Sequence, residues 1–266
     1  MTRKWKARLL RWGAFLALLA SVEAIARAGL VRTSVLVPVT QMLGRLGEML
    51  ATGTIPSPYF RRTGAPSLAF HIASTLQEVG VSFGLAAAVG LPLGSLLWRL
   101  RSLFEILSPY LVAYYAIPLF ALYPLFILAF GAGILPIVLI GFLFGVVVII
   151  VNTAIGMRRV DGEVYPRVGR SLNLSRAQML HGIYLPAASP FIFTGLKLGF
   201  TYSLIGVVAA EFIVSTRGLG HIIDRSYRNF ETANMYAGIW LVLGLALAAN
   251  GALSRLETML YGRFGR

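Results

Sequence analysis

The longest uncharged stretch of the chain extends from Ile106 to Met157 and reads ILSPYLVAYYAIPLFALYPLFILAFGAGILPIVLIGFLFGVVVIIVNTAIGM. A helix needs about 20 residues to cross the hydrocarbon core of a bilayer, so this stretch is long enough for two crossings. The sequence Gly131-Ala132-Gly133, with Pro136 soon after it, indicates a helix break near the middle. We therefore predict two transmembrane helices here, over residues 106–130 and 134–157.

Apolar stretches on either side add four more predicted spans. Two of them, 79–98 and 232–254, contain no charged residue, whereas 12–31 and 190–214 do. Only helices and closed barrels satisfy their backbone groups inside lipid, and these stretches have helical length. The sequence therefore predicts an all-α, polytopic membrane protein with six transmembrane helices.

Two of these spans contain charged residues, which are costly in lipid unless they form ion pairs or lie away from the hydrocarbon core. Glu23 and Arg27 are four residues apart, so they can pair on one face of the first helix. Lys197 lies about a third of the way along the 190–214 span, and Glu211 lies near its far end. Each is expected close to an interface or facing the protein interior.

The composition fits a membrane protein and excludes several other classes. The 266 residues are 57% hydrophobic and only 13% charged, with a mean hydropathy of +0.76. A net charge of +14 would favour nucleic acid in a soluble chain, but these bases lie between long apolar stretches, so we expect a lipid bilayer and no nucleic acid as partner. The chain has no Cys, which excludes disulfides, thiolate metal sites and a Cys nucleophile.

The distribution of Lys and Arg predicts that the N and C termini are both cytoplasmic. With that orientation, inner segments hold about twice as many basic residues as outer segments. Residues 1–11 are then a basic cytoplasmic N-terminus, and residues 32–70 are periplasmic. Within 32–70, an amphipathic run from Val39 to Leu50, followed by Thr52-Gly53, predicts a short interfacial helix and then a loop.

The N-terminus has a second interpretation as a cleavable signal peptide, since a basic segment and an apolar run precede the site Ala24-Ile25-Ala26. Cleavage would leave five spans and the same cytoplasmic C-terminus. We favour an uncleaved first helix that anchors the chain, followed by a core transmembrane domain over 71–266.

Four pairs of glycines predict close helix packing, because small residues four positions apart let helix backbones approach in lipid. The pairs are Gly80/Gly84, Gly90/Gly94, Gly141/Gly145 and Gly195/Gly199. Their spacing does not distinguish packing within one chain from packing between two.

The segment 158–186 is too polar to face lipid and too patterned for a simple linker. It reads RRVDGEVYPRVGRSLNLSRAQMLHGIYLP, with Ser171 and Ser175 as candidate helix caps and Pro166 suited to a first turn. A partial apolar stripe comprises Leu172, Leu174, Met179, Leu180 and Ile183. The pattern favours two short amphipathic helices that form a docking surface for another protein. The alternative is a solvated basic loop that serves only the orientation of the chain.

This segment resembles the cytoplasmic loop of permease subunits of bacterial ABC importers. In that family the loop reads Glu-Ala-Ala, three residues, Gly, nine residues and then Ile-x-Leu-Pro. Ile183-Tyr184-Leu185-Pro186 match its end, and Ser171-Leu172 with Ser175-Arg176 match the usual residues between. Counting back places Asn173 at the Gly position and Arg167-Val168-Gly169 at the Glu-Ala-Ala position.

Both departures bear on function. The family's Gly makes a left-handed turn between two short helices, and Asn is the next most tolerant residue there. Arg167 inverts a charge at the docking site, which implies a co-adapted partner or weakened coupling. The residues that the resemblance assigns to coupling are Arg167, Val168, Gly169, Arg170, Ser171, Asn173, Ser175, Arg176, Ile183, Leu185 and Pro186.

The resemblance extends over nearly the whole chain, which is similar to the nitrate, sulfonate and taurine branch of these permeases. The segments that carry it are Glu23–Arg27, Ile117–Leu119, Ala121–Leu128, Phe130–Gly133, Phe193–Lys197, Ile205–Phe212 and Gly218–Ile223. It implies a type I ABC importer permease fold in the bacterial inner membrane. It also implies a solute such as a sulfonate, taurine or nitrate, with pyrimidine or thiamine-precursor-like compounds as the alternative.

The resemblance also implies partners. Two copies of this chain, or this chain with a second permease, would form the pathway, and two ABC ATPase subunits would dock beneath them. A periplasmic or lipoprotein substrate-binding protein would deliver the solute. No G-x-x-x-x-G-K-[ST] loop occurs in the sequence, so we expect this chain to be no enzyme and to bind no cofactor, with ATP and Mg²⁺ on the ATPase.

Few polar groups lie within the spans, so the candidates for the translocation pathway are few. They are Tyr114, Tyr115, Tyr123, Asn152, Tyr202, Ser203, Glu211 and Asn250, with Pro118 and Pro124 as sites of kinking or exposed backbone. Each has a structural alternative: tyrosines form interfacial belts, Asn152 can bond across helices, and the prolines can kink a span for packing alone.

A membrane-embedded enzyme and an ion-coupled secondary transporter remain open as alternative functions. A membrane enzyme needs a convergent polar cluster, and an ion-coupled secondary transporter often shows internal repeats; neither pattern is evident. His71, His181 and His221 lack metal-ligand spacing, so no metal site is expected.

Overall fold

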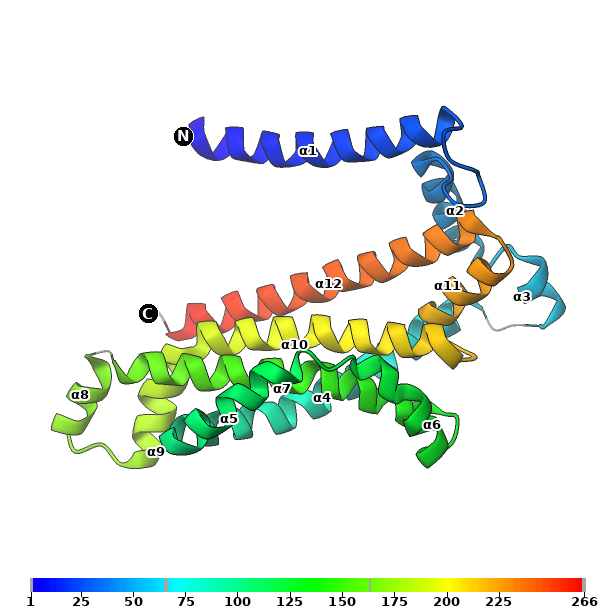
Figure 1. Cartoon of the computed structure of the whole chain (residues 1–266). Coiled ribbons are helices and arrows are strands. Elements are labelled where there is room, and N and C mark those ends of the chain that lie inside the picture. The colour runs from blue at the N-terminus through cyan, green and yellow to red at the C-terminus, as the bar shows by residue number, and fades with distance from the viewer. Residues whose placement is uncertain (1, 65–66, 163, 265–266) are drawn as a thin grey trace. The chain divides into compact units, whose positions relative to one another are not determined.

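The computed structural model describes residues 2–64, 67–162 and 164–264, and every regular element in these ranges is helical (Figure 1). In chain order the elements are α1 (Thr2–Arg27), α2 (Val39–Thr52), α3 (Pro58–Arg62), α4 (Leu68–Arg99), α5 (Arg101–Tyr114), η1 (Leu119–Leu122), α6 (Tyr123–Phe130), α7 (Ile134–Asp161), α8 (Tyr165–Ser171), α9 (Arg176–Met179), η2 (Leu180–Tyr184), α10 (Leu185–Val214), α11 (Leu219–Arg228) and α12 (Thr232–Phe264). The element η1 is a 3₁₀ turn and η2 is a π-helix. Ala65 and Pro66 of the expected 32–70 loop, Glu163 of the 158–186 segment, and the terminal residues 1 and 265–266 lie outside the described ranges.

The chain forms two compact units. The first comprises Met1–Ala73 with Thr216–Gly244, and the second comprises Ser74–Ser215 with Leu245–Arg266. The first unit contains α1, α2, α3 and α11, and the second contains α5 to α10. Helices α4 and α12 contribute to both units.

Four described helices are long and apolar enough to cross a membrane: α4, α7, the α9–α10 stretch and α12. The pair α5 with η1–α6 passes the same test as a single broken span. Five of the six expected spans therefore correspond to such elements. The remaining one, 12–31, falls in α1, which ends at Arg27 rather than at residue 31 and is not among these candidates. The six-span count and the cytoplasmic termini stay predictions.

The expected span 106–130 is present as a broken helix pair, and it bends at the two prolines that the sequence marked as sites of kinking. The chain leaves α5 after Tyr114 and resumes at η1 and α6 with a bend of 80°. Pro118 precedes η1, and Pro124 occupies the first turn of α6. Since proline donates no backbone hydrogen bond and disfavours a helical residue before it, this pair interrupts one helix and starts the next. The expected break at Gly131 is confirmed, with φ at +78° between α6 and α7.

The core of the second unit is built around α7, which lies alongside α10 (Figure 1). Residues Val146–Ile150 of α7 are all buried. A Cβ added at Gly145 would lie 2.3 Å from Ser203 Oγ, and one at Gly199 would lie 2.5 Å from Ile149 Cγ1. Bare glycines thus allow the two helices to approach closely.

Three of the four predicted glycine pairs pack within the chain. Gly90 and Gly94 of α4 contact Ile149 and Thr153 of α7, and the pairs on α7 and α10 are equally close to neighbours. The exception is Gly80/Gly84, where an added Cβ would meet nothing within 4 Å. This pair lies on an exposed face of α4.

The first unit ties the end of α1 to the start of α2. Arg27 Nε donates to Glu23 Oε1 at 2.6 Å, which confirms the expected pair. The backbone N–H and the hydroxyl of Thr40 also donate to the Glu23 carboxylate, at 3.2 and 2.9 Å. The amphipathic run forms α2, which ends at Gly53 in a left-handed conformation, as the Thr52-Gly53 signal predicts.

Candidate functional site

The 158–186 segment folds into two short helices joined by a tight turn. Helix α8 begins at Tyr165, has Pro166 in its first turn and ends at Ser171. Helix α9 begins after Ser175. Asn173 lies between them at φ +56°, which confirms the left-handed turn expected at this position. The N–H of Leu174 donates to the carbonyl of Gly169 at 3.1 Å and closes the turn.

One of the two expected caps is confirmed. Ser175 Oγ accepts from the N–H of Gln178 at 3.3 Å, and the N–H of Ser175 donates to Gln178 Oε1 at 2.8 Å, which is a complete capping box. The expectation for Ser171 was wrong, because its hydroxyl donates to the Val168 carbonyl within α8. Ser171 lies at the C-terminal end of a helix, where no backbone N–H needs an acceptor.

Gly169 fixes how α8 lies on the rest of the segment. The residue is buried, and an added Cβ would lie 2.5 Å from both Ile183 Cδ1 and Met179 Sδ. Only a residue without a side chain allows this contact. Helix α8 therefore packs directly on α9 and η2, which continue into α10.

Asp161, the last residue of α7, connects the segment to two long helices. Its carboxylate accepts from Trp98 Nε1 of α4 at 2.9 Å and from the Tyr184 hydroxyl of η2 at 2.7 Å. The rings of Trp98 and Tyr184 lie 4.4 Å apart. One carboxylate thus joins α4, α7 and η2 at a single junction, which the sequence reasoning did not identify.

The basic residues of the segment fall into two groups. Arg158 lies over the Phe104 ring at 3.9 Å and donates to the carbonyls of Leu97 and Arg101, and Arg159 lies over Phe191 at 5.0 Å. These two arginines therefore stabilise the fold. Arg167, Arg170 and Arg176 are exposed, as is Val168, so α8 and α9 present a cationic surface.

Among the candidates for a pathway, the structure brings Glu211 and Tyr123 together with Thr75 and Glu78, which sequence reasoning did not select. Glu211 is fully buried and accepts from Thr75 Oγ1 at 2.7 Å. Glu78, which only marked the start of a span, is also fully buried. Tyr123 is buried within electrostatic range of both carboxyl groups. The signal available in the sequence was a single acidic residue at one end of each of two apolar stretches: Glu78 just before 79–98, and Glu211 near the end of 190–214.

Other candidates lie at contacts between helices. Tyr114 donates to the Leu143 carbonyl at 2.8 Å, and Asn152 donates to the Val148 carbonyl at 2.8 Å with its Cβ against Gly195. Ser203 is buried against Gly145, and Asn250 donates to Thr201. Each of these side chains serves contact between helices.

Tyr115 and Tyr202 are the candidates that stay exposed, at 51% and 38%, and they lie within electrostatic range of each other. Pro118 and Pro124 are exposed at the bend that separates α5 from α6. Lys197, which was expected at an interface or facing inward, forms a partly buried ion pair with Glu257 of α12.

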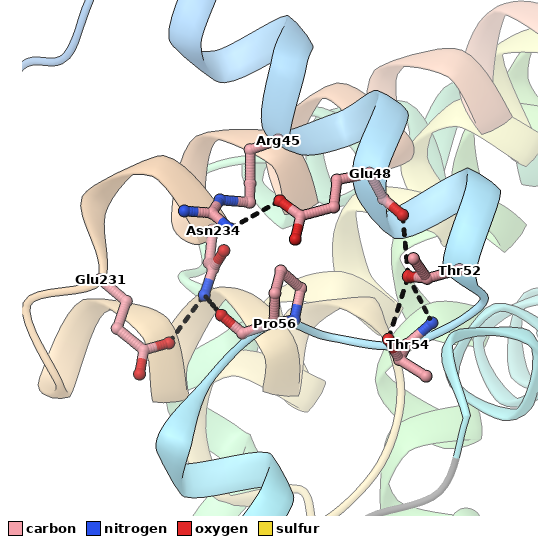
Figure 2. Close-up of polar contacts among 7 residues, drawn as sticks. All are labelled: Arg45, Glu48, Thr52, Thr54, Pro56, Glu231 and Asn234. Atoms are coloured by element: carbon pink, nitrogen blue, oxygen red, sulfur yellow. Dashed lines mark hydrogen bonds and ion pairs between the residues drawn. The ribbon is translucent and has the colours of Figure 1, made fainter.

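In the first unit, a polar cluster fixes the loop after α2 against the start of α12 (Figure 2). Asn234 Nδ2 donates to Glu231 Oε2 at 2.8 Å and to the Pro56 carbonyl at 3.2 Å, and Ser57 Oγ donates to Glu231 Oε1 at 2.7 Å. Arg45 pairs with Glu48 nearby at 2.7 Å.

His71 and His221 stack in the first unit with ring centroids 5.9 Å apart, although 150 residues separate them in the sequence. Both are buried, and Phe60 packs edge-on against each ring. His181 lies elsewhere, in η2. Across the described ranges, no group of three or more His, Cys, Asp or Glu side chains is placed to hold a metal ion.

Comparison with known families gives one match that covers most of the chain. Residues 80–263 match the family described as "Binding-protein-dependent transport system inner membrane component". The chain is 30% identical to the nitrate import permease protein NrtB of Synechocystis over 206 residues, which cover 77% of this chain and 74% of that protein. It is also 30% identical to the taurine transport system permease protein TauC of Escherichia coli, over 71% of this chain and 69% of that protein.

The fold also matches solved structures. Inward-facing structures of the MetNI methionine ABC transporter superpose with TM-scores of 0.63 and 0.59 at 19% identity. The matched regions cover 72% and 71% of this chain, and 95% and 94% of those chains. These structures establish the similarity of fold.

Proposed function

Because the chain belongs to the family of binding-protein-dependent transport system inner membrane components, we propose that it is the permease subunit of an ATP-driven importer in the bacterial inner membrane. ATP and Mg²⁺ would bind to separate ABC ATPase subunits, since this sequence contains no phosphate-binding loop. A second copy of this chain would complete the pathway, and a soluble binding protein would deliver the solute from outside.

The observation that carries this proposal is the construction of the 158–186 segment. Helix α8 is short, exposed and cationic on one side, and packs through Gly169 onto the start of a long apolar helix on the other. The Asp161 junction connects the same segment to α4 and α7. Force applied to α8 by an ATPase would therefore reach three membrane helices. We expect Arg167 on α8 to form an ion pair with an acidic group of that ATPase.

The proposed solute is a small anion or zwitterion. Relatives of this chain are named as permeases for nitrate, taurine, aliphatic sulfonates and bicarbonate, which favours that class. A relative from Halalkalibacterium halodurans is named as a formylaminopyrimidine permease, so a pyrimidine is the second candidate. We assign the exposed pair Tyr115 and Tyr202 to the pathway, since aromatic rings with hydroxyl groups offer contacts to either class.

The test is a pair of glycine substitutions in the complex purified with its own ATPase and reconstituted into liposomes. Gly169→Leu would collide with Ile183 and Met179 and displace α8, whereas Gly182→Leu in η2 enters open space. We expect Gly169→Leu to reduce solute uptake per ATP hydrolysed at least tenfold, and Gly182→Leu to leave that ratio within twofold. Equal ratios in the two variants would contradict the assignment of α8 to coupling.

A further inference from the structure

The second unit contains a cavity of about 720 Å³ where the end of α4 meets the 158–186 segment. It is lined by Pro92, Ser95, Leu96, Trp98, Arg99, Arg170, Leu174, Arg176, Ala177, Met179, Leu180 and Tyr184. None of the candidates for the translocation pathway lines it.

Its lining combines two kinds of surface. Arg99, Arg170 and Arg176 contribute three exposed guanidinium groups, and none of the described lining residues is acidic. Across residues 2–64, 67–162 and 164–264, no ion pair is formed by any of these three arginines. The remaining wall is mostly apolar or aromatic. A ligand that fills the cavity would therefore carry an anionic head and an apolar body.

The position of the cavity along α4 identifies the source of such a ligand. Arg99 is the first charged residue after the uncharged span 79–98, so the cavity opens where that span leaves the hydrocarbon core. Pro92 and Leu96 line it from within the apolar part of the helix, and the arginines line it at the charged end. Phosphate groups of phospholipids lie at this depth, with acyl chains beside the apolar turns.

We propose that this cavity binds one anionic phospholipid, with its phosphate between Arg99, Arg170 and Arg176 and an acyl chain along the apolar wall. Arg170 and Arg176 flank the Asn173 turn, so the bound lipid connects α8 and α9 to α4. Occupancy by anionic lipid would thus hold the 158–186 segment in the arrangement described above. The orientation proposed for the chain places this lipid in the inner leaflet, but the binding itself does not depend on ATP or on transport.

The test is native mass spectrometry of the full-length purified chain with phosphatidylglycerol and phosphatidylcholine at equal concentrations. We expect the wild type to retain one phosphatidylglycerol in preference to phosphatidylcholine. Removing a basic residue near a membrane surface weakens the attraction to anionic lipid about fivefold, so Arg170→Gln and Arg176→Gln should each reduce the preference by about that factor. Arg101→Gln, which removes an exposed charge near the same end of α4 but outside the cavity, is the matched control and should have little effect.

A second variant separates the cavity from surface charge. Ala177 is exposed and lines the cavity, so Ala177→Trp fills it without removing any arginine. We expect this variant to lose the retained phosphatidylglycerol. The proposal is overturned if Arg101→Gln weakens retention as much as Arg170→Gln, or if Ala177→Trp retains lipid like the wild type. Displacement of the lipid by inorganic phosphate at equal concentration would also overturn it, because the site would then be one for a free anion.

Discussion

At the scale of single residues, Asn173 shows most directly how a departure from a family pattern is accommodated. Its φ of +56° is a conformation that costs most residues with a side chain roughly 1–2 kcal/mol but costs Gly almost nothing. Asn is one of the few other residues that adopt it regularly. The turn between α8 and α9 therefore keeps its left-handed conformation although Asn stands where the family has Gly.

This conformation predicts opposite results for two substitutions. Asn173→Gly should leave the melting temperature and uptake unchanged or slightly raised, because Gly relieves the strain. Asn173→Val should lower both, because a β-branched side chain is poorly tolerated at positive φ. Thermal unfolding and uptake measured in the same preparation check this. A neutral Asn173→Val would mean that the turn is not maintained.

The buried carboxyl group of Glu211 gives a second prediction at this scale. Thr75→Val removes the hydroxyl that donates to it and keeps the shape of the side chain. Loss of a buried partner costs about 1–3 kcal/mol. We expect a clear drop in the midpoint of thermal unfolding in detergent. Thr194→Val, at an exposed Thr whose hydroxyl bonds only within its own helix, is the control and should change the midpoint little.

The exposed tyrosines give a third prediction, for transport rather than stability. Tyr202→Ala and Tyr115→Ala should reduce solute uptake severalfold while membrane insertion and basal ATP hydrolysis are retained. Tyr110→Ala, at an exposed tyrosine on α5, the helix that ends one residue before Tyr115, is the control. Uptake lost equally in all three variants would indicate a general effect of the substitution rather than a pathway.

Residue-level prediction from sequence was accurate for three features that local chemistry decides, whereas the cap expected at Ser171 was wrong. The turn at Asn173, the cap at Ser175 and the Glu23–Arg27 pair depend on neighbours within a few positions, and all three are present. The stacking of His71 on His221 and the joining of Trp98 to Tyr184 by Asp161 depend on tertiary packing. A single sequence carries no signal for such pairings.

At the scale of elements, glycines decide which helices lie close together. Gly145 of α7 faces Ser203 of α10 without room for a side chain, whereas Gly84 of α4 faces open space. The identical glycine spacing in the two pairs predicted the same packing for both. Contact within the chain distinguishes them, and Gly80 and Gly84 remain available to lipid or to another chain.

This difference predicts the effect of a matched pair of substitutions. Gly145→Leu should destabilise the chain by about 1–3 kcal/mol or more, because overpacking forces α7 and α10 apart. Gly84→Leu should leave the stability of the isolated chain nearly unchanged. Thermal unfolding in detergent provides the comparison, and a large loss of stability in Gly84→Leu alone would contradict the described face of α4.

The broken span between residues 101 and 130 shows the limit of reasoning from hydropathy. Hydropathy identifies an apolar stretch of sufficient length but not the path of its backbone. Pro118 and Pro124 were recognised as sites of kinking, and together they divide the stretch into two helices bent by 80°. Two prolines six residues apart remove the donors and the geometry that would carry a helix through.

At the scale of the whole molecule, the fold and the family were predictable from sequence. Long apolar helices joined at a basic, patterned segment are the features that hydropathy and charge detect well, and the family match over residues 80–263 agrees with them. Which polar residues face a pathway depends on packing between helices. The solute depends on a few side chains along that pathway, and the relatives themselves are named for different solutes.

The central claim is that this chain transports a solute only when an ATPase docked on the 158–186 segment hydrolyses ATP. The most direct test is to purify the tagged chain from its own membranes, identify what elutes with it, and measure solute uptake into liposomes with and without ATP. We predict a stoichiometric ATP-hydrolysing partner and uptake that requires ATP. Robust uptake by the chain alone, driven by an ion gradient and unaffected by ATP, would contradict the claim and indicate a secondary transporter.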